Sequence, residues 1–493
     1  MRSRGSLSFL RWASLILIFV AAAFTGYQLV RFSRLRSSFA PGMRIADVPV
    51  GGLTQQAAAE RLVQAYGVPV ELRYGDAVIQ ARPQVLGFEL NLEVMLAAAD
   101  LQRIDQPFWG AFWDYLWNQM PVPQSVPLSA KIDENRLRSY LQSEIAPRYD
   151  VPPTASMPVP GSAEFQPGIP GTALDVDRAV VLIEDALRSP NSRVVNLSYS
   201  RISPQRPAFQ NMEVLIKQIL DVSGFDGLTE VYLLDLQTEQ ELNFAYQLGA
   251  DIPPGVAFTA ASTMKVPIMV STYRRVDDPA SETITRMLEL MIERSENDPA
   301  DRLMELMLGG NLGPLELTKD LRALGLENTF LAGYFYPGAP LLVRNETPAN
   351  RRTDISTNPD IYNQTTAAEM GMLLNDIYQC AQTGGGTFAA VWPGEITASE
   401  CQRMIDHLVL NDTPMLLRAG LPEGTRIAHK HGWIQESDGL LHSMANVAII
   451  YTPGGNYILT IFMYQSRQLV FDPVNVLVAD ISRAVYNYYN LPQ

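Results

Sequence analysis

Cysteine and histidine are scarce in this sequence. Its 493 residues include two cysteines, Cys380 and Cys401, and four histidines, of which only His429 and His431 lie close together. Zinc sites are built from closely spaced residues of these two types, so we expect neither a metal site nor a cofactor. The two cysteines are either a disulfide, which an oxidising compartment favours, or two unrelated buried thiols.

Basic charge is also in short supply. Lys and Arg number 38 against 52 Asp and Glu, which gives a formal net charge of −14. A nucleic-acid site needs a basic face to neutralise phosphates, and the sequence shows none after about the first forty residues, so we expect no nucleic-acid partner. An apolar content of 47% and a charged content of 18% are typical of a globular protein. The length favours two or three domains.

One long stretch, Trp12 to Val30, carries no charge and is largely apolar. Six arginines bracket it, namely Arg2, Arg4 and Arg11 before it and Arg31, Arg34 and Arg36 after it. The stretch is long enough to span a bilayer, but the balanced arginines do not fix its orientation. It is either an anchor or a signal peptide cleaved after Ala23. We favour a single-pass membrane anchor over residues 1–38, because the apolar stretch continues past Ala23, and both interpretations place the rest of the chain outside the cytoplasm.

Residues 43–207 alternate short strand patterns with helical patterns and are rich in proline. Two stretches echo each other, 85–92 (VLGFELNL) and 169–176 (IPGTALDV), and a helical pattern follows each. This repetition predicts a duplicated small α+β unit. The pieces VPVGGLTQQAAAERL and LGFELN resemble the peptidoglycan-binding modules that precede some exported cell-wall enzymes. The region is either such a module or a stalk that lifts an enzyme off the membrane.

Aromatic residues recur at helical spacing between the two copies: Phe108, Trp109, Phe112, Trp113 and Trp117. Such a stripe is either part of a core or an exposed face that contacts a membrane interface or a glycan. Because aromatic side chains are usually buried, we expect the stripe to be core.

From about residue 210 the pattern changes. We expect a helix over 212–222, strands over 230–236 and 241–246, a helix-rich middle, strands over 445–451 and 457–464, and a last helix over 474–489. This order predicts an α+β domain over residues 208–493, in which an antiparallel sheet flanked by helices packs against a helical lobe.

Ser262 and Lys265 open an apolar helical stretch inside that domain. A separation of three residues is close to one helical turn, so the hydroxyl and the amine share a face. A serine needs a base to become a nucleophile, and a lysine with a lowered pKa can be that base. A Ser-x-x-Lys sequence is also common by chance, and a serine cap beside a solvated lysine is the alternative.

Two further motifs follow along the chain. Ser295 and Asn297 occupy alternate positions of a short loop between two helical patterns, where they are either cleft residues or helix caps. Lys430 and Gly432 lie just ahead of the final strands. A lysine followed by a glycine on an edge strand offers a cation for a substrate carboxylate and backbone space for the substrate. An ordinary strand lysine is the alternative.

In this order the three motifs resemble the Ser-x-x-Lys, Ser-x-Asn and Lys-Thr-Gly signatures of class A β-lactamases and penicillin-binding proteins. The resemblance extends from about residue 210 to 490. It implies that Ser262 attacks an acyl carbonyl, that Lys265 is a candidate base, and that Ser295 relays a proton to the leaving nitrogen. A covalent acyl-enzyme follows from these roles.

The resemblance also assigns the substrate contacts. Asn297 would hold the substrate amide and Lys430 its carboxylate, while the backbone N–H groups of Ser262 and Trp433 would form the oxyanion hole. Two positions depart from the family pattern: Glu296 replaces an aspartate, and His431 replaces a threonine whose hydroxyl helps to bind the carboxylate. The resemblance therefore does not fix the substrate affinity.

Release of the acyl group depends on Glu346. Glu346 and Asn350 fit the Glu-x-x-x-Asn spacing of the family's omega loop, although a solvated loop acid is the alternative. If Glu346 activates water, the enzyme hydrolyses β-lactams. If it does not, the acyl-enzyme persists, as in a penicillin-binding D,D-carboxypeptidase that acts on peptidoglycan stem peptides. A catalytically idle cell-wall-binding protein is the third possibility.

Overall fold

A computed structural model of the chain describes residues 5–277 and 280–491, so Arg2 and Arg4 lie outside the described residues. The chain forms two compact units. The first comprises Met1–Pro153 and Pro170–Ser203 and is called here the N-terminal unit. The second comprises Thr154–Ile169 and Pro204–Gln493 and is called the C-terminal domain.

The N-terminal unit begins with the long helix α1 (Gly5–Arg36). Its part from Arg11 to Arg36 is long and apolar enough to cross a membrane, and no other helix among the described residues is. A signal sequence has the same properties, so length and composition alone leave both interpretations open.

The rest of the N-terminal unit consists of short elements. Its helices are α2 (Gln55–Tyr66), α3 (Leu92–Ile104), α4 (Phe108–Leu116), α5 (Glu134–Tyr140), α6 (Ala146–Tyr149) and α7 (Val176–Arg188), with a π-helical turn over Leu141–Ile145. Its strands are β1 (Arg44–Ile45), β2 (Val48–Pro49), β3 (Val70–Tyr74), β4 (Ala77–Ala81), β5 (Phe88–Leu90), β6 (Ala130–Ile132), β9 (Gly171–Leu174), β10 (Val194–Asn196) and β11 (Tyr199–Ile202).

The two echoing stretches form similar local structures. Each is a short strand, β5 or β9, followed by a helix, α3 or α7. The side chains of Asn91 and Asp175 accept hydrogen bonds from backbone N–H groups in the first turn of these helices, which satisfies donors that a helix start leaves open. The sheets stay small: β5 pairs with β6, β9 with β11, and β3 lies between β10 and β4.

The aromatic stripe corrects one expectation. Phe112 on α4 is buried, but Trp109, Trp113 and Trp117 are 65%, 61% and 70% exposed. The prediction that the stripe is core is therefore wrong for its tryptophans. One face of α4 packs against α1 through Phe108, Phe112 and Tyr115, and the three tryptophans lie away from that contact.

The C-terminal domain contains the larger elements. Its helices are α8 (Asn211–Ser223), α9 (Lys265–Tyr273), α10 (Glu282–Ile292), α11 (Asn297–Met307), α12 (Gly313–Ala323), α13 (Ala367–Thr383), α14 (Thr387–Val391), α15 (Ala398–Val409) and α16 (Phe471–Tyr489), with 3₁₀ turns over Ala261–Met264, Gly310–Leu312 and Leu416–Gly420. Its strands are β7 (Met157–Pro158), β8 (Phe165–Gln166), β12 (Leu228–Asp235), β13 (Glu241–Gln247), β14 (Ala250–Ile252), β15 (Phe258–Thr259), β16 (Phe330–Leu331), β17 (Asn363–Thr365), β18 (Arg426–Gln435), β19 (Leu441–Tyr451) and β20 (Tyr457–Tyr464).

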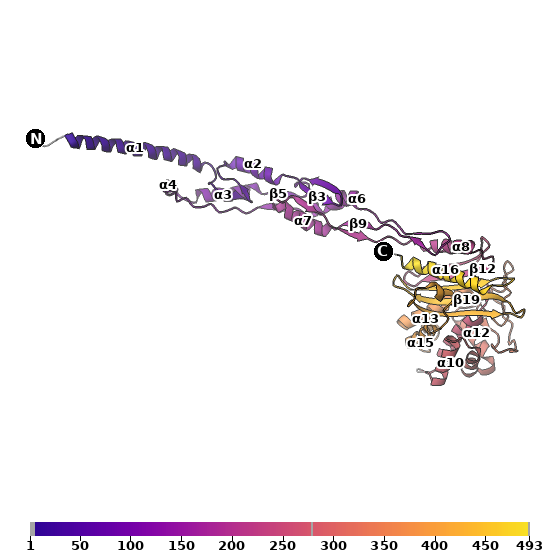
Figure 1. Cartoon of the computed structure of the whole chain (residues 1–493). Coiled ribbons are helices and arrows are strands. Elements are labelled where there is room, and N and C mark those ends of the chain that lie inside the picture. The colour runs from indigo at the N-terminus through magenta and orange to yellow at the C-terminus, as the bar shows by residue number, and fades with distance from the viewer. Residues whose placement is uncertain (1–4, 278–279, 492–493) are drawn as a thin grey trace. The chain divides into compact units, whose positions relative to one another are not determined.

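A six-stranded antiparallel sheet organises this domain, in the order β14-β13-β12-β20-β19-β18. Helices α8 and α16 cover one face, and the helical lobe that contains α13 and α15 covers the other (Figure 1). Alternate residues of β12 serve the two sides, Val231 in one core and Tyr232 in the other. The predicted α+β fold is confirmed.

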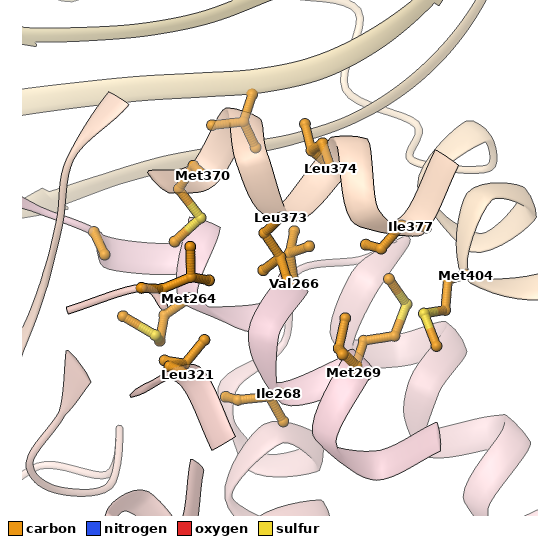
Figure 2. Packing of buried hydrophobic residues seen from close by; sticks show 14 of the residues in the cluster. Met264, Val266, Ile268, Met269, Leu321, Met370, Leu373, Leu374, Ile377 and Met404 are labelled. Carbon is orange, nitrogen blue, oxygen red and sulfur yellow. The ribbon is translucent and has the colours of Figure 1, made fainter. Parts of the chain in front are cut away.

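The lobe positions the predicted nucleophile through α9, all of whose residues are buried. Val266 and Met269 of α9 pack against Leu373 and Ile377 of α13 and Met404 of α15 (Figure 2). A helix that is apolar on every side belongs inside a core. The position of its first turn is therefore fixed by packing on all sides.

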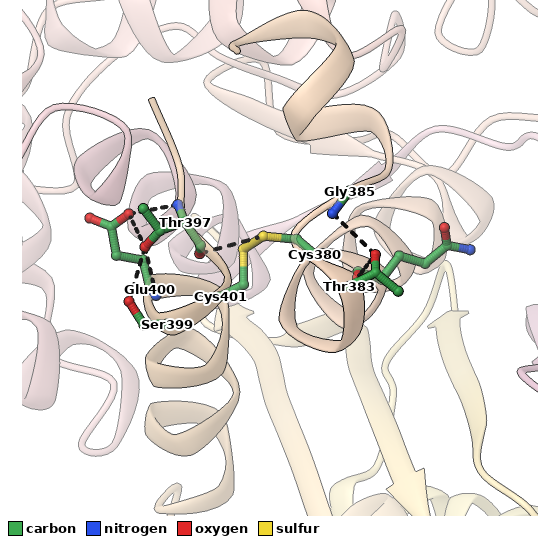
Figure 3. Close-up of a disulfide and its surroundings, with 8 residues drawn as sticks. Cys380, Thr383, Gly385, Thr397, Ser399, Glu400 and Cys401 are labelled. Carbon is green, nitrogen blue, oxygen red and sulfur yellow. Dashed lines mark hydrogen bonds between the residues drawn. A yellow bond between two sulfur atoms is a disulfide. The ribbon is translucent and has the colours of Figure 1, made fainter. Parts of the chain in front are cut away.

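Cys380 of α13 and Cys401 of α15 form a disulfide, with their Cα atoms 5.9 Å apart (Figure 3). The neighbouring Thr397 caps α15, and its own backbone N–H donates to Glu400 Oε2 at 2.8 Å. The disulfide thus joins two helices of the lobe beside a well-capped helix start.

Candidate active site

Ser262 lies in the 3₁₀ turn that leads into α9 and is half-buried. The residue before it, Ala261, has φ of 48°, which is a strained backbone conformation for alanine. Its N–H donates to Asn363 Oδ1 at 2.7 Å, and this bond helps to hold the turn. Strand β18 passes close by, since a Cβ on Gly432 would lie 2.8 Å from Ala260 O. Only glycine fits there.

Lys265 links the first two motifs. Its Nζ donates to Ser262 Oγ at 2.9 Å, to Asn297 Oδ1 at 2.7 Å and to Ser295 O at 2.6 Å. The side chain is fully buried. Burial lowers the pKa of Lys265 to about 7, although the charge of Asp301 acts in the opposite direction. A neutral amine is therefore available beside the serine hydroxyl near neutral pH.

Ser295 and Lys430 form the other side of the site. Ser295 has φ of 60° and precedes α11, whose first residue is Asn297. Lys430 Nζ donates to Ser295 Oγ at 2.7 Å. Burial, reinforced by the nearby Lys265, lowers the pKa of Lys430 well below its usual value. A hydrogen-bonded chain thus runs from Ser262 through Lys265 and Ser295 to Lys430.

His431 and Trp433 alternate with Lys430 and Gly432 along β18, so their side chains leave the strand on its other side. Their rings stack with centroids 4.4 Å apart, and the Trp433 ring packs against Phe471 of α16. Burial lowers the pKa of His431 to about 2, so the ring is neutral. Its Nδ1 is buried and has no hydrogen-bond partner in the part of the chain that the structure describes.

Glu346 is not brought into this group. Its side chain is 76% exposed, and its charged neighbour is Arg351 at 4.0 Å. Among the described residues, no hydrogen bond or ion pair joins Glu346 to Ser262 or Lys265. Asn350, its partner in the expected motif, donates to Gln364 Oε1 at 2.9 Å and thereby ties the loop to β17.

Two neighbours of Lys265 are absent from the sequence prediction. The ring centroid of Phe335 lies 5.5 Å from Lys265 Nζ. The Phe335 N–H donates to Asp301 Oδ1 at 2.8 Å, which fixes the loop beside the lysine. Asp301 follows Asn297 by four residues on α11, so helical spacing alone indicates that they share a face. Phe335 gives no comparable signal, because its position depends on how a long loop folds back.

Known proteins match the C-terminal part of the chain. Residues 277–489, which follow Ser262 and Lys265, match a family model described as the beta-lactamase enzyme family. No curated protein matches the sequence. A solved structure of PBP-A has 23% identity, covers 58% of this chain and 98% of its own, and has a TM-score of 0.41.

Two solved β-lactamases are also similar. An ancestral (GNCA) class A β-lactamase has 23% identity over 55% of this chain and 98% of its own, with a TM-score of 0.39. The TLA-1 extended-spectrum β-lactamase has 17% identity over 57% of this chain and 99% of its own, with a TM-score of 0.43. The family match includes the second and third motifs, with Ser295, Asn297 and Lys430, and begins after Ser262 and Lys265. The C-terminal domain thus contains a region similar to the beta-lactamase enzyme family, as the resemblance of the motifs implies.

Proposed function

We propose that this protein is an extracytoplasmic acyl-serine enzyme, in which Ser262 is acylated by a β-lactam or a D-Ala-D-Ala-like amide and holds the acyl group. The observation that carries the proposal is the contact between Lys265 Nζ and Ser262 Oγ at 2.9 Å, in a setting that lowers the pKa of Lys265 to about 7. A base of this strength is deprotonated in part at neutral pH and lies within reach of the proton it must remove.

Acylation then proceeds in two coupled steps. Lys265 Nζ takes the proton of Ser262 as Oγ bonds to the substrate carbonyl carbon, and the backbone N–H groups of Ser262 and Trp433 stabilise the oxyanion. As the C–N bond of the amide breaks, Ser295 Oγ gives its proton to the leaving nitrogen and regains one from Lys265 Nζ, which holds the proton taken from Ser262 and lies 3.5 Å from Ser295 Oγ.

Recognition of an anionic substrate follows from the charge balance of the site. Lys430 is fully buried, and no carboxylate pairs with it within the described ranges. Without a counter-charge, burial favours the neutral form of Lys430 and lowers its pKa well below the usual value. A substrate carboxylate would supply that charge, while Asn297 would hold the substrate amide. Both the acyl-D-Ala-D-Ala end of a peptidoglycan stem peptide and a β-lactam carry such a carboxylate.

Slow release of the acyl group is the second part of the proposal. Hydrolysis of an acyl-serine needs a base that activates water close to the ester. The Phe335 ring lies beside Lys265, and Glu346 lies in solvent. These positions favour a penicillin-binding protein with a D,D-carboxypeptidase type of reaction over an efficient β-lactamase.

The location of the enzyme completes the proposal. The apolar run of α1 is compatible with a single-pass anchor, and the catalytic domain would then lie outside the cytoplasm. An exported enzyme with this chemistry meets peptidoglycan as its natural substrate. Whether the N-terminal unit itself binds glycan is tested by its retention on purified cell walls, with and without competing glycan fragments.

One experiment tests the function. The full chain in detergent is incubated with a fluorescent penicillin and with a chromogenic cephalosporin, alongside Ser262→Ala and the exposed control Ser466→Ala. We expect a stable label on the wild type and on Ser466→Ala, none on Ser262→Ala, and little hydrolysis. Rapid cephalosporin turnover would show an efficient β-lactamase instead, and neither label nor turnover would overturn both enzymatic interpretations.

A matched variant tests the reason for the slow release. Phe335→Glu places a carboxylate beside Lys265, where the wild type has an aromatic ring. We expect the variant to lose its penicillin label faster than the wild type, because the new carboxylate can activate water at the ester. An unchanged label lifetime in a variant that still acylates would contradict the role given to Phe335.

A further inference from the structure

Three exposed tryptophans lie on α4 and at its C-terminal cap in the N-terminal unit. Trp109, Trp113 and Trp117 follow each other at intervals of four residues and are each more than half exposed. Tryptophan is costly to leave in water, and its amphipathic ring is enriched where apolar and aqueous phases meet. An exposed row of three therefore points to a partner with such a boundary.

Helix α4 is fixed to α1. The ring of Phe32 on α1 lies 5.4 Å from Phe108, 5.5 Å from Phe112 and 5.3 Å from Tyr115, as measured between centroids. Tyr115 Oη also donates to Gln28 Oε1 at 3.1 Å. The tryptophan face of α4 is thus held at a defined level along α1.

That level is the end of the apolar run. At 1.5 Å per residue, the run from Trp12 to Val30 rises about 28 Å, which is close to the ~30 Å of a bilayer's hydrocarbon core. Gln28 and Phe32, the contacts of α4, lie on either side of Val30. If α1 spans the membrane, α4 lies at the boundary between hydrocarbon and headgroups.

The surroundings of α4 have the composition of an interface. Leu101 and Ile104, at the end of α3, are 63% and 58% exposed, and Val122 is 89% exposed. Arg36 and Arg103 lie among these apolar residues: Arg36 donates to Gln106 O, and Arg103 donates to Arg36 O. Apolar side chains with arginines between them are typical of segments that rest on phospholipid headgroups.

We propose that α4 is an interfacial helix, which lies on the leaflet at the C-terminal end of α1 with Trp109, Trp113 and Trp117 among the phospholipid headgroups. The N-terminal unit is then attached to the membrane at two places, the span and this helix, and its orientation to the bilayer is restricted. The inference rests on the proposed anchoring by α1 and adds a second lipid contact to it.

Quenching of tryptophan fluorescence by brominated phospholipids tests the proposal. The full chain is reconstituted in vesicles whose acyl chains carry bromine either near the headgroups or near the bilayer centre. The triple variant Trp109→Phe, Trp113→Phe, Trp117→Phe is compared with the wild type and with the control Trp392→Phe, which removes a buried tryptophan of the C-terminal domain. The difference in quenching between the wild type and the triple variant reports on these three tryptophans alone, because Trp12 is present in both proteins.

We expect the triple variant to lose most of the quenching by shallow bromines, whereas Trp392→Phe keeps it. A quenching loss confined to deep bromines, or no loss at all in protein that remains vesicle-bound, would overturn the interfacial helix while leaving the anchor intact. Wild-type protein that does not float with vesicles would instead contradict the anchor. Retention on purified peptidoglycan that disappears only in the triple variant would assign the tryptophans to glycan and also overturn the proposal.

Discussion

The two units of the molecule differ in the basic side chains that they bury. Within the described part of the N-terminal unit, one charged side chain is buried, Arg193, which stacks over the Tyr66 ring and donates to Tyr66 O. The C-terminal domain buries two lysines, Lys265 and Lys430, whose hydrogen bonds go to hydroxyls, an amide and carbonyls. Such burial costs folding free energy. The difference indicates that the lysines serve chemistry and that Arg193 serves packing.

The units also differ in how they bury apolar surface. The six-stranded sheet of the C-terminal domain is covered on both faces and supports two cores. The N-terminal unit has one core beneath sheets of two or three strands and leaves several tryptophans exposed. A rigid double-faced core suits a site whose atoms must stay in place, and a small core with an exposed apolar face suits attachment.

The largest effect is expected from Lys265→Met, which removes the base but keeps an unbranched chain. The acylation rate should fall by about 10²–10⁴-fold, the usual contribution of a general base, while stability should not fall, because a buried cation is replaced by an apolar side chain. The measurement is the rate of labelling by fluorescent penicillin together with a thermal melt. The exposed Lys319→Met is the control. Equal labelling rates in the two variants would refute the assignment.

Separate cores predict separate unfolding. Leu62→Ala opens a cavity in the core of the N-terminal unit, and Leu373→Ala opens one in the lobe beneath α9. Each should cost about 2–5 kcal/mol of unfolding free energy, and in calorimetry each should move a different transition. Penicillin labelling should suffer only in Leu373→Ala. A single transition that both variants shift equally would show that the units unfold together.

The comparison also separates what sequence can predict from what it cannot. The partnership of Ser262 with Lys265 follows from helical spacing, and four strands of the large sheet, β12, β13, β19 and β20, follow from the strand pattern of the sequence. The contact of Phe335 with Lys265 has no local signal, because it depends on the path of the loop between β16 and β17. The expectation that aromatic side chains are buried is wrong for Trp113. Helical periodicity shows which residues share a face, but it does not show which face packs against another element.

The disulfide should contribute less to the free energy of unfolding than the upper end of the about 2–5 kcal/mol expected for a core leucine. It closes a loop of 21 residues in the C-terminal domain, for which chain entropy gives about 3 kcal/mol. The double variant Cys380→Ser, Cys401→Ser should have a lower melting temperature for the C-terminal domain alone. Dithiothreitol should produce the same shift in the wild type. A shift in the other transition, or none in either, would contradict this assignment.

The dependence of acylation on pH follows from Lys265. Because its pKa is lowered to about 7, the amine is neutral above that pH and protonated below it. Only the neutral amine accepts the serine proton, so the labelling rate should be level above about pH 7 and fall about tenfold for each pH unit below it. A stopped-flow profile measures this. A midpoint near the ordinary lysine value of about 10.4 would mean that the amine stays charged in the site.

The smallest effect is expected from Glu346→Gln. The carboxylate is exposed and paired loosely with Arg351, and exposed substitutions of this kind usually change free energies by less than about 0.5 kcal/mol. The lifetime of the penicillin label should therefore change by less than about twofold, whereas Phe335→Glu should shorten it. If Glu346→Gln instead lengthens the label lifetime many-fold, the loop must bring Glu346 to the ester during the reaction. The chain would then hydrolyse β-lactams with a carboxylate that its resting structure keeps in solvent.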